Sequence, residues 1–94
     1  MSYKLEFLED ALKEWNKLGA TIKQQFKNKL KERLEEPEIS SSKLSGAKDR
    51  YKIKLRSAGY RLVYEVNNEI VTVVVIAVGK RERNSVYKIA AKKV

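Results

Sequence analysis

The chain has 94 residues, of which 43% are hydrophobic and 35% are charged, and its formal net charge is +9. This composition is typical of one ordinary globular domain, expected to span residues 1–94. No apolar run approaches the roughly 18–20 residues of a transmembrane helix, and no apolar signal-peptide core is recognisable, so we expect a cytoplasmic protein without a membrane partner. The chain has no cysteine and no histidine, which excludes disulfides, thiolate chemistry and the usual zinc sites.

The excess positive charge lies in the second part of the sequence. Residues 1–42 carry eight cations and eight anions, whereas residues 43–94 carry thirteen cations and four anions. Such an asymmetry indicates a polyanionic partner, although a basic surface that only keeps the protein soluble is an equally good explanation from charge alone.

The chain begins with a pattern that predicts a strand and then a helix. Residues 3–7 alternate apolar and charged side chains, as in a half-buried strand. Apolar residues then recur at helical spacing over residues 8–18. Gly19 follows them, where a left-handed cap would end the helix.

A second helix is predicted from the apolar stripe at residues 22–34, which would complete a helical hairpin. Thr21 and Gln24 are spaced as a capping box at its start, and Pro37 ends the pattern. The cations from Lys23 to Arg33 alternate with glutamates, so we interpret them as a solvated helix face.

The stretch YKIKLRSAGYRLVYEV, Tyr51–Val66, predicts a β-hairpin with one apolar and one cationic face. A two-residue loop at Ala58 and Gly59 would close it. In that register the cationic face pairs Arg56 with Arg61, Lys54 with Val63 and Lys52 with Glu65. The apolar face pairs Tyr51 with Val66, Ile53 with Tyr64 and Leu55 with Leu62.

The rest of the chain completes an α+β pattern. Asn67 and Asn68 form a turn, and the β-branched run IVTVVVIAV at residues 70–78 predicts a central strand buried on both faces. A short, weakly amphipathic helix is expected from Asn84 or Ser85 onward. We therefore expect a small antiparallel sheet with the helical hairpin on one face and a short C-terminal helix.

The clustered cations are the chemical signal of this sequence. The carboxylates of the basic half are too scattered to predict a metal site, and the serines lack a neighbouring base for acyl transfer. Lysines and arginines gathered on one face can hold a phosphodiester and stabilise the charge of its transition state. Phosphate binding alone does not establish an enzyme.

Two stretches together, residues 51–66 and VGKRERNSVY at residues 78–87, resemble the RelE family of ribosome-dependent messenger-RNA endonuclease toxins. The likeness extends through ALKEWNKLG and KLKERLEEP to essentially the whole chain. It implies a fold similar to microbial ribonucleases and a type II toxin that inhibits translation. In this family the 2′-hydroxyl of the message attacks the neighbouring phosphate in the ribosomal A site, without a metal or cofactor.

The resemblance also implies roles for five residues. Lys52 and Lys54 would hold the scissile phosphate, and Arg61 would stabilise the transition state. Arg81 would stabilise it too and protonate the leaving oxygen, and Tyr87 would be the general base, with a lysine as the alternative base. Six further cations are expected to contact ribosomal RNA or solvent: Arg56, Lys80, Arg83, Lys88, Lys92 and Lys93.

The implied partners are a RelB-like antitoxin, the small ribosomal subunit with its RNA, and messenger RNA, while DNA would be contacted only through the antitoxin complex. Two other functions stay open at this point. A toxin resembling the ParE family would share the fold but poison gyrase. A basic RNA-binding protein would use the same cations without catalysis.

Overall fold

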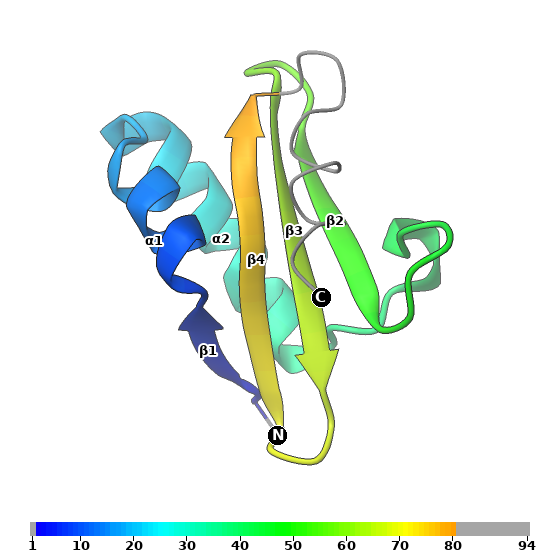
Figure 1. Ribbon diagram of the computed structural model, residues 1–94. Helices are drawn as coiled ribbons and strands as arrows, with labels where there is room; N and C mark the ends of the chain where they lie inside the picture. Colours follow the sequence, from blue (N-terminus) through cyan, green and yellow to red (C-terminus); the bar gives the residue numbers. More distant parts are fainter. Residues whose placement is uncertain (1, 81–94) are drawn as a thin grey trace.

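The computed structural model describes residues 2–80 of the chain (Figure 1). The elements follow in the order β1 (Lys4–Phe7), α1 (Glu9–Asn16), α2 (Ala20–Glu35), a 3-10 turn η1 (Ser40–Ser42), β2 (Arg50–Leu55), β3 (Tyr60–Asn67) and β4 (Thr72–Lys80). The α+β class and the strand, helix, helix, three-strand order are as predicted. The C-terminal helix expected from Asn84 or Ser85 lies outside the described residues. Among residues 2–80, no helix is both long and apolar enough to cross a membrane.

The sheet is mixed, so the expected all-antiparallel arrangement was wrong. Its strand order is β1-β4-β3-β2, with β1 parallel to β4 and the other two pairings antiparallel. The parallel pair is extended at its two ends by backbone hydrogen bonds from Lys4 N–H to the Val71 carbonyl (2.9 Å) and from Leu8 N–H to the Val75 carbonyl (3.0 Å). The apolar strand β4 lies between β1 and β3, as its β-branched run predicted.

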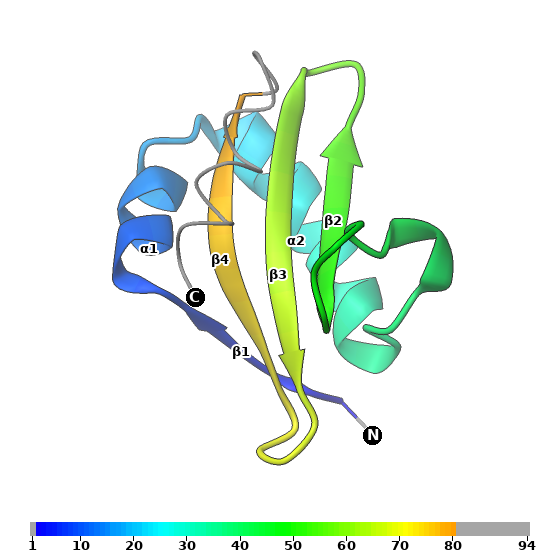
Figure 2. The same ribbon diagram turned by 45° about the vertical axis from the view of Figure 1, so that its right-hand side comes forward.

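Both helices pack on one face of the sheet, which confirms the helical hairpin. Ala11 and Trp15 of α1 and Phe26 and Leu30 of α2 are buried in one cluster with side chains of β2, β3 and β4. In Figure 2, α2 lies behind the strands β3 and β2. The hairpin therefore covers one face and leaves the cations of β2 on the other.

The junction between the helices differs from the prediction. Gly19 has φ −65° and is the extended N-cap of α2, not a left-handed C-cap of α1. The first helix is capped by Lys17 in a right-handed conformation. The Lys17 N–H donates to the Glu14 carbonyl and the Leu18 N–H donates to the Trp15 carbonyl, both at 3.1 Å, so no left-handed residue is needed. Thr21 lies inside α2, and no side chain caps that helix, so the capping box was wrong as well.

The β2–β3 hairpin closes through four residues, 56–59, and not through two. Gly59 has φ +71°, which favours glycine, and its N–H donates to the Leu55 carbonyl at 2.8 Å. Leu55 consequently faces Tyr60, and every cross-strand partner is shifted by two residues from the prediction. Because side chains alternate with a period of two, this shift changes the partners but keeps each residue on its predicted face.

A β-bulge in β4 gives the open face of the sheet a small apolar cluster of its own. Val63 pairs with Ala77 and Tyr64 with Val75, so Ile76 is the extra residue. Ile76 and Ala77 pack against Val63, apart from the core beneath the helices. The open face is therefore cationic along β2 and apolar along the centre of the sheet.

Candidate active site

Lys52 and Lys54 alternate along β2 and lie on the face of the sheet away from the helices, because Tyr51, Ile53 and Leu55 between and beside them are buried in the helix-covered core. Arg61 of β3 is the direct partner of Lys54. Directly opposed residues in an antiparallel pair have Cβ atoms about 4.5–5.5 Å apart on one face. The three cations that the resemblance assigned to the scissile phosphate are thus brought together.

The two-residue shift in register also changes the partner of the nearest anion. Glu65 was expected opposite Lys52, but it lies opposite Arg50 and forms a salt bridge with it, with 3.0 Å between Arg50 Nε and Glu65 Oε2. Lys52 instead faces the buried Val63. The carboxylate that would have neutralised Lys52 is therefore bound to another cation.

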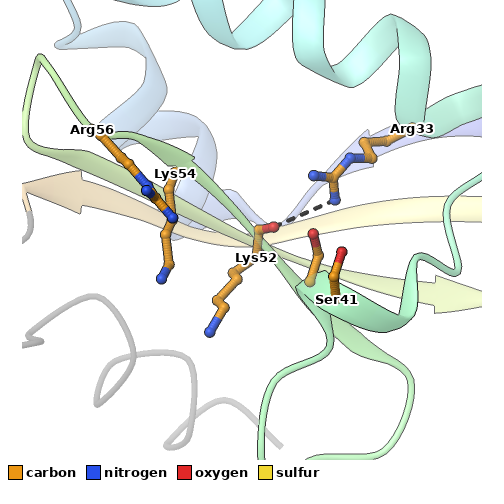
Figure 3. Close-up of a pocket in the computed structure, with 6 residues that line it drawn as sticks. Arg33, Ser41, Lys52, Lys54 and Arg56 are labelled. Carbon is orange, nitrogen blue, oxygen red and sulfur yellow. Dashed lines mark hydrogen bonds between the residues drawn. The ribbon is translucent and has the colours of Figure 1, made fainter.

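A cleft of about 340 Å³ opens beside β2 (Figure 3). Among residues 2–80, its lining contains four cations, two hydroxyl side chains and no carboxylate: Arg33, Ser41, Ser42, Lys52, Lys54 and Arg56. Four positive charges and two hydroxyl donors around one hollow suit an anionic ligand, and arginine and lysine donors suit phosphate oxygens in particular. This cleft is the candidate site of the described residues.

Arg33 is a member of the cleft that sequence reasoning missed. It is half-buried, and its Nη1 donates to the hydroxyl of Tyr64 at 3.0 Å and to the carbonyl of Lys52 at 3.4 Å. The periodic cations of α2 indicated only a solvated helix face, which is wrong for Arg33. No local signal marks it, because its contacts come from strands 19 and 31 residues later in the chain.

Tyr64 anchors this side of the site. Its side chain is fully buried, its hydroxyl donates to the Pro37 carbonyl at 2.6 Å, and its ring stacks on Tyr51 with centroids 5.6 Å apart. Burial raises the pKa of the Tyr64 hydroxyl, although the hydrogen bond and charge of Arg33 oppose the shift. The phenol is therefore uncharged near pH 7, and its hydroxyl holds Arg33 in a fixed position through a hydrogen bond.

Ser41 and Ser42 belong to η1, which lies along the outer edge of β2. Ser42 N–H donates to the Ile39 carbonyl at 2.9 Å within this turn, and Lys43 forms an isolated antiparallel bridge with Tyr51. This bridge holds the polar segment 38–48 against β2 and brings its serines to the cleft. Two neutral donors thereby face the cations of β2 and α2.

Arg61 is 4% exposed although it lies on the open face. Its Nη1 donates to the Tyr60 carbonyl at 3.0 Å, and no carboxylate of residues 2–80 forms a salt bridge with it. Arg61 does not line the cleft itself. Its guanidinium is fixed beside Lys54, so it adds positive potential next to the cleft.

The remaining predicted residues divide into two groups. Arg56 is exposed in the hairpin turn and lines the cleft, whereas Lys80 is exposed at the end of β4 and does not. The others lie outside the described residues: Arg81, Arg83, Tyr87, Lys88, Lys92 and Lys93. Their roles stay predictions.

Two further features bear on the chemistry of the described part. Within residues 2–80, no three aspartates or glutamates come together as metal ligands would, and a metal-independent reaction stays a prediction. A second hollow, about 250 Å³, lies between β1 and the helices and is lined mostly by apolar side chains such as Phe7, Trp15 and Leu30.

Comparison with known proteins places the chain in a family. The profile described as ParE toxin of type II toxin-antitoxin system, parDE, matches residues 5–85. The mRNA interferase toxin RelE of Escherichia coli strain K12 is 60% identical over 94 residues, covering 100% of this chain and 99% of that protein. The mRNA interferase RelE of Shigella flexneri is equally similar.

Solved structures agree with the sequence comparison. A mutant of E. coli toxin RelE in the free state has a TM-score of 0.92 at 57% identity, covering 100% of this chain and 99% of that chain. RelE in the intact E. coli RelBE toxin-antitoxin complex has a TM-score of 0.84 at 61% identity, covering 87% of this chain and 100% of that chain. The chain belongs to the RelE family of toxins, within the RelE/ParE superfamily.

Proposed function

We propose that this chain is the toxin of a type II toxin–antitoxin pair and an endoribonuclease that cuts messenger RNA in the ribosomal A site. The observation that carries the proposal is the grouping of Lys52, Lys54 and Arg61 on one open sheet face, in a chain 60% identical to an mRNA interferase over its whole length. A scissile phosphate placed over this face would meet Lys52 and Lys54, with the buried Arg61 beside them and no nearby free carboxylate of the described residues.

The proposed reaction is an internal transfer within the RNA strand. The 2′-hydroxyl loses its proton to a base and its oxygen attacks the neighbouring phosphorus. The bond from phosphorus to the 5′-oxygen then breaks, and that oxygen receives a proton, which leaves a 2′,3′-cyclic phosphate and a 5′-hydroxyl. Lys52 and Lys54 would hold the phosphate oxygens, and Arg61 would stabilise the charge that develops on them.

The proton-transfer roles rest on the family resemblance. Tyr87 is proposed as the base and Arg81 as the donor to the leaving oxygen, with a lysine as the alternative base. A tyrosine has an ordinary pKa of about 10, so the surrounding cations would have to favour its ionised form. Such a base is weak near neutrality, which gives a physical reason for depending on the ribosome to orient the message.

Regulation is proposed to come from a RelB-like antitoxin. The similar E. coli RelE has been solved in the intact RelBE toxin-antitoxin complex. A mutant of E. coli RelE has been solved in complex with a peptide of the antitoxin, RelBc. A nuclease of the cell's own messages has to be held inactive, and a chain of net charge +9 offers a surface that anionic side chains can meet. Any contact with DNA would be made through the antitoxin complex.

A ParE-like action on gyrase is the second candidate, because the matching family profile carries the ParE name. The two functions differ in the first process that stops in a cell. Induced expression of the chain should arrest protein synthesis before any DNA damage response begins. Early DNA damage with translation still running would favour the ParE-like function.

The decisive experiment compares free RNA with RNA on ribosomes. Purified protein should leave free RNA nearly intact at physiological salt, and should cut the same message when it is bound in programmed ribosomes. The new 3′ ends should carry cyclic phosphate. Efficient cleavage of free RNA, or 3′-hydroxyl ends, would contradict the mechanism.

A matched pair of variants completes this test. Lys52→Ala with Lys54→Ala removes two cations of the cleft, and Lys29→Ala with Lys31→Ala removes two cations of α2 that do not line it. Both double variants have the same net charge. Only the first should abolish cleavage, and equal losses in both would mean that net charge alone matters.

A further inference from the structure

Arg33 is held in place at the Lys52 end of the cleft. In Figure 3 its guanidinium points toward the Lys52 carbonyl, with Ser41 close by, while Arg56 lies at the opposite end. Only one of its nitrogens, Nη1, donates to the Tyr64 hydroxyl and the Lys52 carbonyl. The donors on Nε and Nη2 have no acceptor among the described residues, so they are available to a ligand in the cleft.

The immobility of Arg33 comes from the protein core. Its partner Tyr64 is fully buried and is fixed by the Pro37 carbonyl and by stacking on Tyr51. The guanidinium carbon also lies 5.9 Å from the centre of the Tyr64 ring, a cation–π contact. An arginine fixed in this way loses little side-chain freedom when it binds an anion, which favours binding.

The charge of Arg33 has no counterion in the described part of the chain. The salt bridges of residues 2–80 join Lys17 to Glu14 and Arg50 to Glu65, and neither involves Arg33. A half-buried, fixed guanidinium beside two serine hydroxyls is a donor set for phosphate oxygens, with charge from the arginine and neutral hydrogen bonds from the serines. The cleft is therefore prepared for an anion at this end as well.

The Arg33 end of the cleft lies apart from the Lys54 and Arg56 end along the direction of β2. Alternate residues of a strand are about 6.6 Å apart, so Lys52 and Lys54 follow one another along β2. Arg56 of the turn lies beyond Lys54, and Arg33 with the serines lies beyond Lys52 (Figure 3). A volume of about 340 Å³ also exceeds what one phosphate group fills. The cleft can thus receive consecutive phosphates of one strand.

We propose that Arg33, Ser41 and Ser42 form a second phosphate subsite, which binds the phosphodiester next to the scissile one in the RNA strand. This inference rests on the proposed function, because it takes the phosphate at Lys52 and Lys54 as the reacting one. The subsite would set the position of the strand along the cleft. It would thereby help to choose which bond is cut.

The test measures binding without cleavage. The full-length protein is titrated with a short single-stranded RNA that carries 2′-deoxyribose at the reacting position, and binding is followed by NMR over a series of salt concentrations. Each ionic contact with a phosphate of single-stranded nucleic acid contributes about 0.7 to the slope of log K against log salt. Arg33→Gln, which keeps a donor for Tyr64, should reduce that slope by about 0.7.

Two comparisons separate the subsite from general charge. Lys31→Gln changes the net charge equally, but Lys31 lies on the part of α2 that lines the apolar hollow, and it should leave the slope unchanged. The double variant Ser41→Ala with Ser42→Ala removes neutral donors, so it should weaken binding severalfold at every salt concentration and keep the slope. Thermal unfolding of each variant confirms that it is folded.

The position of the subsite is tested by neutralising one phosphate at a time as a methylphosphonate. One substitution next to the scissile phosphate should weaken binding to the unaltered protein and have no further effect on Arg33→Gln. Additive losses at every phosphate would overturn the proposal, as would no binding of RNA at millimolar concentration. The proposal would also be overturned if Arg33→Gln weakened the binding of a RelB-like antitoxin peptide but not the binding of RNA. The subsite would then serve a protein carboxylate.

Failure of the subsite and failure of the proposed function are distinguishable. The binding experiment contains no cleavage step and no ribosome. If the chain did not cut messages on ribosomes, coupling between Arg33 and one phosphate would still establish an RNA subsite. If it did cut them, absence of coupling would remove the subsite alone.

Discussion

Lys54 and Arg61 are direct partners across the β2–β3 pairing, so two positive side chains oppose each other on the open face of the sheet. Like charges in this position ordinarily destabilise a sheet. Arg61 is also 4% exposed and forms no salt bridge within residues 2–80, and burial makes an unpaired charge costly. Such a pair is suited to a site that binds an anion, because the attraction of a bound phosphate to both cations offsets their mutual repulsion.

The pair gives a kinetic prediction. Lys54→Ala and Arg61→Ala should each lower single-turnover cleavage on saturated ribosomes by about 10²–10³-fold, the usual loss when one group that stabilises a transition-state oxyanion is removed. The double variant should lose less than the product of the two, because both residues act on one phosphoryl group. Lys31→Ala serves as control. If Lys54→Ala lowered only affinity, Lys54 would be a binding residue.

The faces of this hairpin could be predicted from sequence, but the partners could not. The alternation of Lys52, Ile53, Lys54 and Leu55 fixes which residues share a face, and any shift by an even number keeps that assignment. The loop length decides the partners. Residues 56–59 form a four-residue turn because the left-handed residue is Gly59, and SAGY is equally compatible with a two-residue loop.

Features that depend on distant contacts were missed for a different reason. The parallel pairing of β1 with β4 joins segments about 68 residues apart, and the local pattern of either strand is the same in both orientations. Arg33 has the helical spacing of an ordinary solvated cation. Its role in the cleft comes from Tyr64 and Lys52, which no helical periodicity indicates.

The hydroxyl of Tyr64 should contribute measurably to stability. Tyr64→Phe removes the donor to the Pro37 carbonyl and the acceptor for Arg33, and both groups lose a partner in a part-buried or buried position. We expect the free energy of unfolding in urea to fall by about 1–3 kcal/mol. Tyr3→Phe is the control, because the Tyr3 hydroxyl is exposed where it donates to Asn68, and it should change stability by less than about 0.5 kcal/mol.

The raised pKa of Tyr64 predicts a loss of stability at high pH. Burial favours the neutral phenol in the folded state, whereas the unfolded chain ionises with a pKa of about 10. The stability that the neutral form contributes is complete below that pH and is lost as the pH rises through the higher folded pKa, because the unfolded state has then released more protons.

Urea unfolding between about pH 8 and about pH 11 measures this effect. The decline in stability should be shallower in Tyr64→Phe than in the unaltered protein. It should not vanish, because burial, Glu38 and Asp49 also raise the pKa of Tyr51. Tyr3→Phe should keep the full decline, and an identical decline in all three proteins would contradict the assignment.

The turn before β4 holds a strained residue, and relieving it should stabilise the protein. Val71 has φ +50°, a left-handed conformation that costs a residue with a Cβ roughly 1–2 kcal/mol and is especially poor for a β-branched one. The Val71 carbonyl accepts a hydrogen bond from the Lys4 N–H at 2.9 Å. This bond, at the point where β1 joins β4, holds Val71 in the strained conformation. Asparagine tolerates this conformation and keeps the same backbone groups.

Val71→Asn should therefore raise the free energy of unfolding by about 1 kcal/mol, less whatever apolar burial the half-buried valine supplies. Ile70→Asn is the matched control, because it removes an exposed apolar side chain from the same turn at a residue without positive φ. It should give no gain. If Val71→Asn gave no gain in the free energy of unfolding over Ile70→Asn, packing of the valine side chain would outweigh the backbone strain, and the prediction would be wrong.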